Sequence, residues 1–308
     1  MDILWGDPES TLTKWKTPLF EDEKIVELPV DQRTVTRRYT QKAIDFIIAN
    51  QKNPFFVYLP HSMPHIPLYV PDDVRDPNHL NAYTNTIEHI DAEVGRLMDK
   101  VRELGLSKNT YVIYTTDNGP WLLYGDHAGS AHPLREGKGT NFEGGFRVPC
   151  VMRWPGTIPP RSVCSEIAGT IDLFPTFAAL ADASLPPHKI DGKDILPLMT
   201  AEPGAKTPHE YFFHYDGANR LMAVRGGKWK LMFPQTYNSP EGGGAGMPGK
   251  SVRKELELSL FDLESDIGET TNLAGKHPEV VKRLEAAAEQ MRADLGDGAQ
   301  AGTGRRFE

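Results

Sequence analysis

The chain has 308 residues, of which 39% are hydrophobic and 25% charged, as in ordinary folded globular proteins. Its formal net charge is −8 and it contains no dense cluster of Lys and Arg, which argues against a nucleic-acid partner. No apolar run reaches the roughly 18 residues that a membrane-spanning helix needs, so no membrane insertion is predicted.

Helical periodicity first appears after an irregular N-terminal stretch. The apolar positions from Val35 to Ile48 recur at the spacing of an amphipathic helix. After Pro54, the uninterrupted apolar run from Phe55 to Leu59 is typical of a strand covered on both faces. A second amphipathic helix is predicted from Thr86 to Leu104, with Gly105 at the position of a C-cap.

The next elements continue an alternation of helices and strands. Residues 111–115 are β-branched or aromatic and predict a buried strand, and residues 148–154 predict another short one. A short helix from Ile171 to Ala181 is expected to be interrupted by Pro175. The order of elements implies crossover connections and a parallel sheet. The long glycine-rich loop over 119–147 is predicted to be functional.

The pattern changes after about residue 205. Two short strands around Gly226 and Gly227 predict a hairpin over 221–233, and residues 256–263 alternate like an antiparallel strand. Residues 239–250 read as a flexible loop. A final helix begins at Pro278, a favourable first-turn residue.

The predicted architecture is therefore α/β. Residues 1–205 are expected to form a mostly parallel sheet flanked by helices, and residues 206–308 a smaller subdomain with an antiparallel sheet and one terminal helix. The two cysteines, Cys150 and Cys164, are too few for a disulfide framework and are expected to be buried free thiols, with pairing as the alternative.

The strand over 111–115 is followed by Asp117, Asn118 and Gly119. Ligands of open α/β sheets bind beyond the carboxyl ends of strands. A carboxylate beside an amide oxygen suits Ca²⁺ or Mg²⁺, which prefer oxygen ligands. The alternative is a simple turn, because all three residue types favour turns.

His61 and His65 follow the other predicted strand end, in a loop rich in proline. The prolines exclude a helix, so the spacing of the two histidines has no zinc geometry. A histidine at such a position can act as a general acid near neutral pH. A surface-loop histidine without a function is the alternative.

Lys138 lies between Gly137 and Gly139, where backbone amides can approach a ligand closely. Its ammonium suits a tetrahedral oxyanion. The alternative is a solvated lysine. The loop has neither the spacing of a Walker phosphate loop nor a Gly-x-Ser-x-Gly elbow.

Together these segments resemble the sulfatase family, of the arylsulfatase A-like type, in the alkaline-phosphatase superfamily. The resemblance runs in family order over about residues 40–295. The matching stretches are PHIPLYVP, TTDNGPWLLYGDHAGSAHPLREGKGTNFEGGFRVP, MRWPGTIPP, GTIDLFPTFAALA, AVRGGKWKLMF and LFDLESDIGETTNLA.

The resemblance implies hydrolysis of sulfate esters through a formylglycine nucleophile, made from a cysteine or serine. It implies that Asp117 and Asn118 are ligands of a divalent metal, usually Ca²⁺. Lys138 would contact the sulfate and the leaving-group oxygen, and His65 would lie near the leaving group. His61 is a less certain substrate neighbour.

The sequence departs from the family pattern in its first half. The family's first half, which is expected to bring a strand ending in the paired aspartates of the metal site, is absent. The nucleophile motif Cys/Ser-x-Pro-Ser-Arg has no match in the 308 residues. We therefore expect Ca²⁺ binding to be weak or absent and formylglycine to be unavailable to this chain. The leading interpretation is a truncated sulfatase that is inactive alone.

Other interpretations stay open. The chain could work with a separate chain, serve as a non-catalytic module for sulfated or phosphorylated ligands, or be a phosphodiesterase of the same superfamily. The expected partner is a small sulfate ester or a sulfated sugar. Trp121 and Tyr124 either stack on that ligand or pack in the core.

Incomplete sheet edges also predict possible self-association. The N-terminus lacks the features of a signal peptide, so the location of this chain is not assigned. A full-length parent would be expected in the periplasm or outside the cell.

Overall fold

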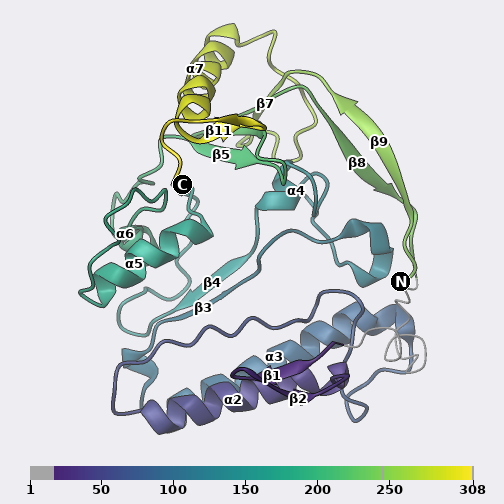
Figure 1. Ribbon diagram of the computed structural model, residues 1–308, viewed down its shortest axis with the longest axis vertical. Helices are drawn as coiled ribbons and strands as arrows, with labels where there is room; N and C mark the ends of the chain where they lie inside the picture. Colours follow the sequence, from purple (N-terminus) through teal and green to yellow (C-terminus); the bar gives the residue numbers. More distant parts are fainter. Residues whose placement is uncertain (1–16, 245, 307–308) are drawn as a thin grey trace. The chain divides into compact units, whose positions relative to one another are not determined.

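The computed structural model describes residues 17–244 and 246–306 (Figure 1). The chain forms two compact units, and each unit combines three segments. Unit 1 comprises residues 1–110, 120–130 and 240–252, and unit 2 comprises residues 111–119, 131–239 and 253–308. The predicted domain boundary between residues 205 and 206 falls inside unit 2 and stays a prediction.

Two helices, α2 (Val35–Asn50) and α3 (Ala82–Glu103), pack against each other in unit 1 (Figure 1). The first confirms the helix predicted from periodicity, and the second begins at Ala82 rather than Thr86. The unit also holds the antiparallel pair β1 (Leu19–Glu21) and β2 (Lys24–Glu27). Its short 3-10 turns are η1 (Gln32–Thr34), η2 (His79–Asn81), η3 (Ser107–Asn109) and η4 (Leu122–His127). One buried cluster joins the loop that follows residues 55–59 to the start of α3 and to the segment around η4. Its members are Ile66, Leu68, Val70, Ala82, Tyr124 and Ala128.

The strand predicted from Phe55 to Leu59 is not formed. Its side chains alternate between half-buried and exposed, as in extended chain, and the exposed fractions of Phe56 and Tyr58 are 68% and 79%. A strand needs a neighbour to complete its hydrogen-bond ladder, and no described segment pairs with this one. The apolar run correctly indicated an extended backbone, but the backbone is not hydrogen-bonded to a neighbouring strand.

Unit 2 contains a two-stranded and a four-stranded antiparallel sheet (Figure 1). β3 (Val112–Thr115) pairs with β4 (Cys150–Arg153). The larger sheet has the order β10-β7-β6-β5, formed by β5 (Phe212–Tyr215), β6 (Leu221–Gly226), β7 (Trp229–Met232) and β10 (Ser259–Asp262). α7 (Pro278–Leu295) packs against β6 and β7. The predicted hairpin and the predicted start of the last helix are both confirmed.

Successive side chains of the four-stranded sheet point to opposite faces, and each face is covered by other parts of the chain. One face packs against α7, and this cluster includes Val224, Leu231, Leu260 and Leu284. The opposite face packs against Phe142, with Ala223, Met232 and Phe261. Lys230 lies between Leu231 and Trp229 in β7, so it shares the face of Met232 and Phe142.

The remaining elements are short. They are α4 (Glu143–Phe146), η5 (Thr170–Asp172), α5 (Leu173–Leu180), α6 (Leu196–Met199), β8 (Gln235–Glu241), β9 (Lys250–Leu256), β11 (Gly296–Asp297) and β12 (Gln300–Ala301). Pro175 lies in the first turn of α5 and does not interrupt it, because proline is tolerated there. The segment predicted to be a flexible loop over 239–250 instead includes ends of the paired strands β8 and β9.

The predicted α/β class is confirmed, as is the C-terminal antiparallel sheet with its helix. Every strand pair recorded among the described residues is antiparallel, so the expected parallel pairing is not formed there. Cys150 and Cys164 are free but exposed. Their predicted burial was wrong, and for Cys150 the reason is that β4 pairs only with β3 in the described chain. None of the helices in that part of the chain combines the length and apolarity needed to cross a membrane.

Candidate functional site

The end of β3 delivers Asp117 and Asn118 to a tight turn in unit 2. The backbone N–H of Gly119 donates a hydrogen bond to the carbonyl oxygen of Gly145, at 3.0 Å. A Cβ atom on Gly119 would lie 1.7 Å from the carbonyl oxygen of Gly144, so only glycine fits. The Asp117 side chain is exposed, and Asn118 is half-buried. This turn, residues 117–119, is called the Asp-Asn turn below.

Lys138 lies at the second position of a turn over residues 137–140, called the Lys138 turn. The backbone N–H and the hydroxyl of Thr140 both donate to the carbonyl oxygen of Gly137, at 3.2 and 2.9 Å. Gly139 follows Lys138 with a φ of +88°, which a type II turn requires at its third position. The turn therefore fixes the backbone that carries the half-buried Lys138.

The short helix α4 joins these two turns. A Cβ atom on Gly145 would lie 2.3 Å from the carbonyl oxygen of Thr140 and 2.8 Å from that of Gly137, so α4 touches the Lys138 turn backbone to backbone. The same Gly145 accepts the hydrogen bond from Gly119 in the Asp-Asn turn. The structure thus brings Lys138 and the Asp117–Asn118 pair onto one continuous framework within unit 2.

His65 lies in unit 1 and is exposed. Its Nδ1 atom is 2.6 Å from the carbonyl oxygen of Ile66. A carbonyl oxygen only accepts hydrogen bonds, so Nδ1 carries the ring proton and Nε2 is the atom able to exchange a proton with a ligand. The ring of Trp121 lies beside it, with centroids 5.9 Å apart.

His61 also lies in unit 1, but its surroundings differ from those of His65. Both ring nitrogens are shielded from solvent and have no hydrogen-bond partner among the described residues. Burial lowers the pKa of His61, and the nearby Glu93 only partly opposes this effect. A role of His61 in substrate contact stays a prediction, and the shielding of its ring does not favour it.

The oxygen atoms available for a metal are few. Asn118 uses its Nδ2 atom to donate to the carbonyl oxygen of Gly119, at 3.0 Å, so its Oδ1 atom is left for a cation. Ca²⁺ is bound by six to eight oxygens. Within residues 17–244 and 246–306, no group of three or more His, Cys, Asp or Glu side chains could hold a metal ion. A role of Asp117 and Asn118 as ligands of a divalent cation stays a prediction.

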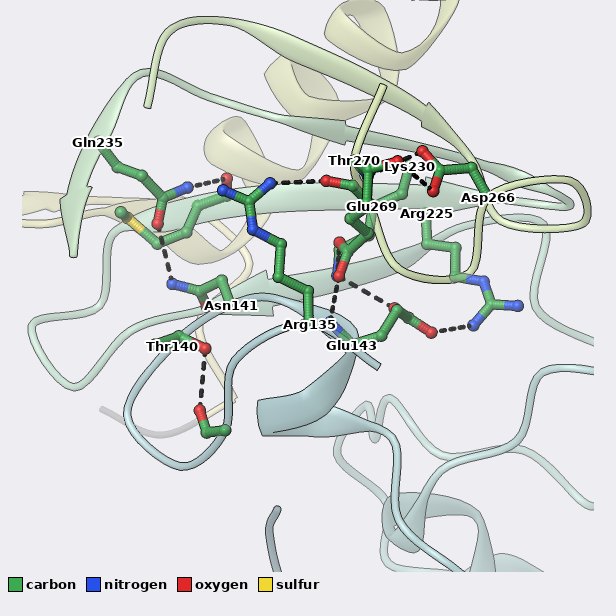
Figure 2. A network of polar contacts seen from close by, with 12 residues as sticks. Arg135, Thr140, Asn141, Glu143, Arg225, Lys230, Gln235, Asp266, Glu269 and Thr270 are labelled. Atoms are coloured by element: carbon green, nitrogen blue, oxygen red, sulfur yellow. Dashed lines mark hydrogen bonds and ion pairs between the residues drawn. The ribbon is translucent and has the colours of Figure 1, made fainter. Parts of the chain in front are cut away.

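Arg135 supports this framework and was not singled out from the sequence. Arg135 precedes the Lys138 turn, and its guanidinium lies 4.1 Å from the ring centroid of the buried Phe142. It also donates a hydrogen bond to the carbonyl oxygen of Glu269, at 2.6 Å (Figure 2). A second hydrogen bond goes to the hydroxyl of Tyr237, at 3.1 Å. The hydrogen-bond partners of Arg135 lie more than 100 residues away along the chain, so no local pattern could have identified them.

Three family models match the chain. The model described as sulfatase matches residues 5–183, the C-terminal region of aryl-sulfatase matches residues 207–304, and the C-terminal model of N-sulphoglucosamine sulphohydrolase matches residues 137–241.

Curated proteins similar to this chain are also described as sulfatases. Arylsulfatase A of Homo sapiens is 36% identical over 282 residues, covering 87% of this chain and 55% of the relative. Steryl-sulfatase of Mus musculus is 33% identical over 299 residues, covering 90% of this chain and 48% of the relative. The solved complex of Ps i-CgsB with k-i-k-neocarrahexaose has a TM-score of 0.72 and 25% identity, covering 94% of this chain and 60% of that one. The chain thus spans about half the length of the curated relatives it matches.

Proposed function

Because this chain belongs to the sulfatase family, we propose that it carries part of the substrate site of a sulfuric ester hydrolase. In this proposal Lys138 binds the sulfate group of the substrate. Asp117 and Asn118 supply two oxygen ligands to a divalent cation at the same group. A cation and an ammonium both stabilise negative charge on sulfate oxygens, which is the largest contribution in many reactions of this kind.

The observation that carries the proposal is the framework formed by α4. The Gly145 backbone touches the Lys138 turn and accepts a hydrogen bond from the Asp-Asn turn. A sulfate group needs donors whose positions are set before it binds, because ordering them during binding costs free energy. Two turns closed by backbone contacts meet that need better than flexible loops.

In the doubly protonated form of its ring, His65 is proposed to give the Nε2 proton to the leaving-group oxygen and to keep the Nδ1 proton, which is bound to a carbonyl oxygen. Trp121 lies beside His65 and is half-buried. It is proposed to contact an aryl or sugar leaving group, whereas Tyr124 is buried in the core of unit 1 and serves packing. The substrate is therefore expected to be a sulfate ester of an aromatic compound or a sugar. The complex of Ps i-CgsB with a neocarrahexaose supports the sugar class.

The test measures binding of inorganic sulfate to the intact chain by calorimetry. The substitution Lys138→Met is expected to weaken binding about tenfold, because it removes one charge-assisted hydrogen bond worth roughly 1.4 kcal/mol. Lys206→Met is the matched control, since that exposed lysine pairs with Glu166 outside the framework. Equal affinity in wild type and Lys138→Met would contradict the role of Lys138.

The same measurement compares sulfate with phosphate. The family model favours sulfate. Preferential binding of phosphate would favour a phosphodiesterase of the same superfamily. Tight binding of a sulfated sugar without any turnover would instead favour a non-catalytic binding module.

A further inference from the structure

Four ionisable side chains cluster behind α4 and are called here the buried quartet: Lys230, Glu143 and Glu269, which are buried, and Arg225, which is half-buried. The Nζ atom of Lys230 lies 3.0 Å from Oε1 of Glu143 and 2.9 Å from Oε1 of Glu269 (Figure 2). Lys230 and Glu269 are fully buried, and Glu143 is 1% exposed. The quartet contains two cations and two anions, so its formal charge is balanced.

The sheet places the two cations of the quartet directly opposite each other. Arg225 on β6 and Lys230 on β7 are cross-strand partners. Like charges in that position repel, so the pair needs an anion between them. Glu143 supplies it, with Oε1 toward Lys230 and Oε2 3.1 Å from Nη1 of Arg225. Because Glu143 is the first residue of α4, the sheet holds this helix by its charge.

Glu269 binds the same helix by another route. Its Oε2 atom accepts a hydrogen bond from the backbone N–H of Glu143, at 2.7 Å. Its carbonyl oxygen accepts from Arg135, the residue that precedes the Lys138 turn. Glu269 has a φ of +51°, a conformation that side-chain-bearing residues rarely adopt, so surrounding contacts must fix it.

The ionisation of the two carboxyl groups depends on Lys230. Burial raises the pKa of both. At Glu143 the charges of Lys230 and Arg225 outweigh burial, and the pKa lies below its ordinary value. At Glu269 burial outweighs Lys230, and the pKa lies above its ordinary value. Removing Lys230 alone would leave two buried carboxyl groups with Arg225 as the remaining cation of the quartet.

We infer that Lys230 is a positioning residue for the proposed sulfate site, acting through Glu143 and α4 on the Lys138 turn and the Asp-Asn turn. The inference rests on the proposed function in taking Lys138 as the sulfate contact. A displacement of α4 would shift Gly145 and with it both turns, because their backbones are in direct contact. The C-terminal sheet thereby sets the geometry of a site to which it contributes no ligand.

The decisive experiment uses a charge-balanced variant, Lys230→Met combined with Glu269→Gln. It removes one cation and one anion, leaves Glu143 paired with Arg225, and keeps an oxygen at position 269 to accept from the backbone of Glu143. The matched control is Lys228→Met combined with Asp262→Asn. Lys228, in the turn between β6 and β7, lies 2.7 Å from Asp262 at the end of β10, and neither residue belongs to the quartet.

Hydrogen exchange of the intact chain reports the position of α4. The amides of Gly119 and Gly144 donate to Gly145 and Arg135, respectively, and are expected to lose about tenfold in protection in the charge-balanced variant. The amides that pair β6 with β7 are expected to keep their protection. Unchanged exchange at Gly119 and Gly144 overturns the inference, and so does equal loss throughout the sheet, which indicates a purely structural role.

Sulfate binding supplies a second readout. The charge-balanced variant is expected to bind sulfate about tenfold more weakly than the control. The same two substitutions should weaken sulfate binding far less in a chain that already carries Lys138→Met. In that chain the sulfate contact of Lys138, which Lys230 is inferred to position, is missing. Full additivity of the two effects counts against the inference. A wild-type chain that binds no sulfate contradicts the proposed function, and hydrogen exchange then still decides the role of Lys230.

Discussion

His214 shows how burial determines the chemistry of a single residue. Its side chain is 2% exposed on β5, and its Nδ1 atom has no hydrogen-bond partner in the described part of the chain. Burial lowers the pKa of His214 well below 6.5, and the neighbouring cations Lys230 and Arg225 lower it further. The folded protein therefore holds this histidine neutral beside the buried quartet.

Stability should depend on pH through His214. Below about pH 6.5 the unfolded chain binds a proton at this residue and the folded chain does not, so the free energy of unfolding falls as the pH drops. The slope due to this residue is at most about 1.4 kcal/mol per pH unit, and above pH 6.5 it vanishes. Urea unfolding between about pH 5 and pH 7.5 measures it.

The variant His214→Phe keeps the contact with the ring of Phe146, at 4.3 Å between centroids, and removes the titrating group. It is expected to flatten the pH dependence relative to wild type. The exposed His188, changed to Gln, is the control. His61 and His89 also have lowered pKa values and add to the wild-type slope, so the comparison is the difference between variant and wild type. An unchanged slope in His214→Phe would show that this histidine is not held neutral.

At the scale of elements, α4 illustrates how a helix of four residues can matter to a site. It is too short to be stable by itself, since most helical stability comes from packing. Its glycines allow close backbone contacts on two sides, and Glu143 binds the sheet behind it. The helix is therefore a spacer whose position is set by its neighbours.

The substitution Gly144→Ala tests this close contact. The new Cβ atom would lie 2.1 Å from the carbonyl oxygen of Glu136 and 2.4 Å from that of Arg135, so the loop must move. We expect a loss of about 1–3 kcal/mol in the free energy of unfolding and a clear loss of sulfate affinity. Gly275→Ala is the control, because its Cβ would meet nothing within 4 Å. Chemical denaturation and calorimetry measure the two effects, and an unaffected Gly144→Ala would refute the tight contact.

At the scale of the whole molecule, the 308 residues carry only part of the chemistry expected for a sulfatase. The motif Cys/Ser-x-Pro-Ser-Arg, which supplies the nucleophile in the family, has no match in them. Lys138 is proposed to bind sulfate and His65 to give a proton, and neither is proposed as the nucleophile. Self-association of the chain through an exposed sheet edge stays a prediction.

We therefore expect that the purified 308-residue chain does not hydrolyse an aryl sulfate ester, with or without added Ca²⁺. The measurement is release of the phenol, compared between wild type and Lys138→Met, and neither should exceed the uncatalysed rate. Turnover by the wild-type chain that disappears in Lys138→Met would prove that a nucleophile is present after all.

Local sequence patterns determined α2, α7 and the β6–β7 hairpin, because helical spacing and turn residues act between near neighbours. The motif around Asp117 and Lys138 indicated the family, which the comparisons confirm. Only the tertiary structure decided that the run from Phe55 forms no ladder, since pairing depends on a distant strand. It alone decided that Lys230 contacts Glu143, because the two residues are 87 positions apart. Burial of either charge is unfavourable unless the fold places the opposite charge beside it.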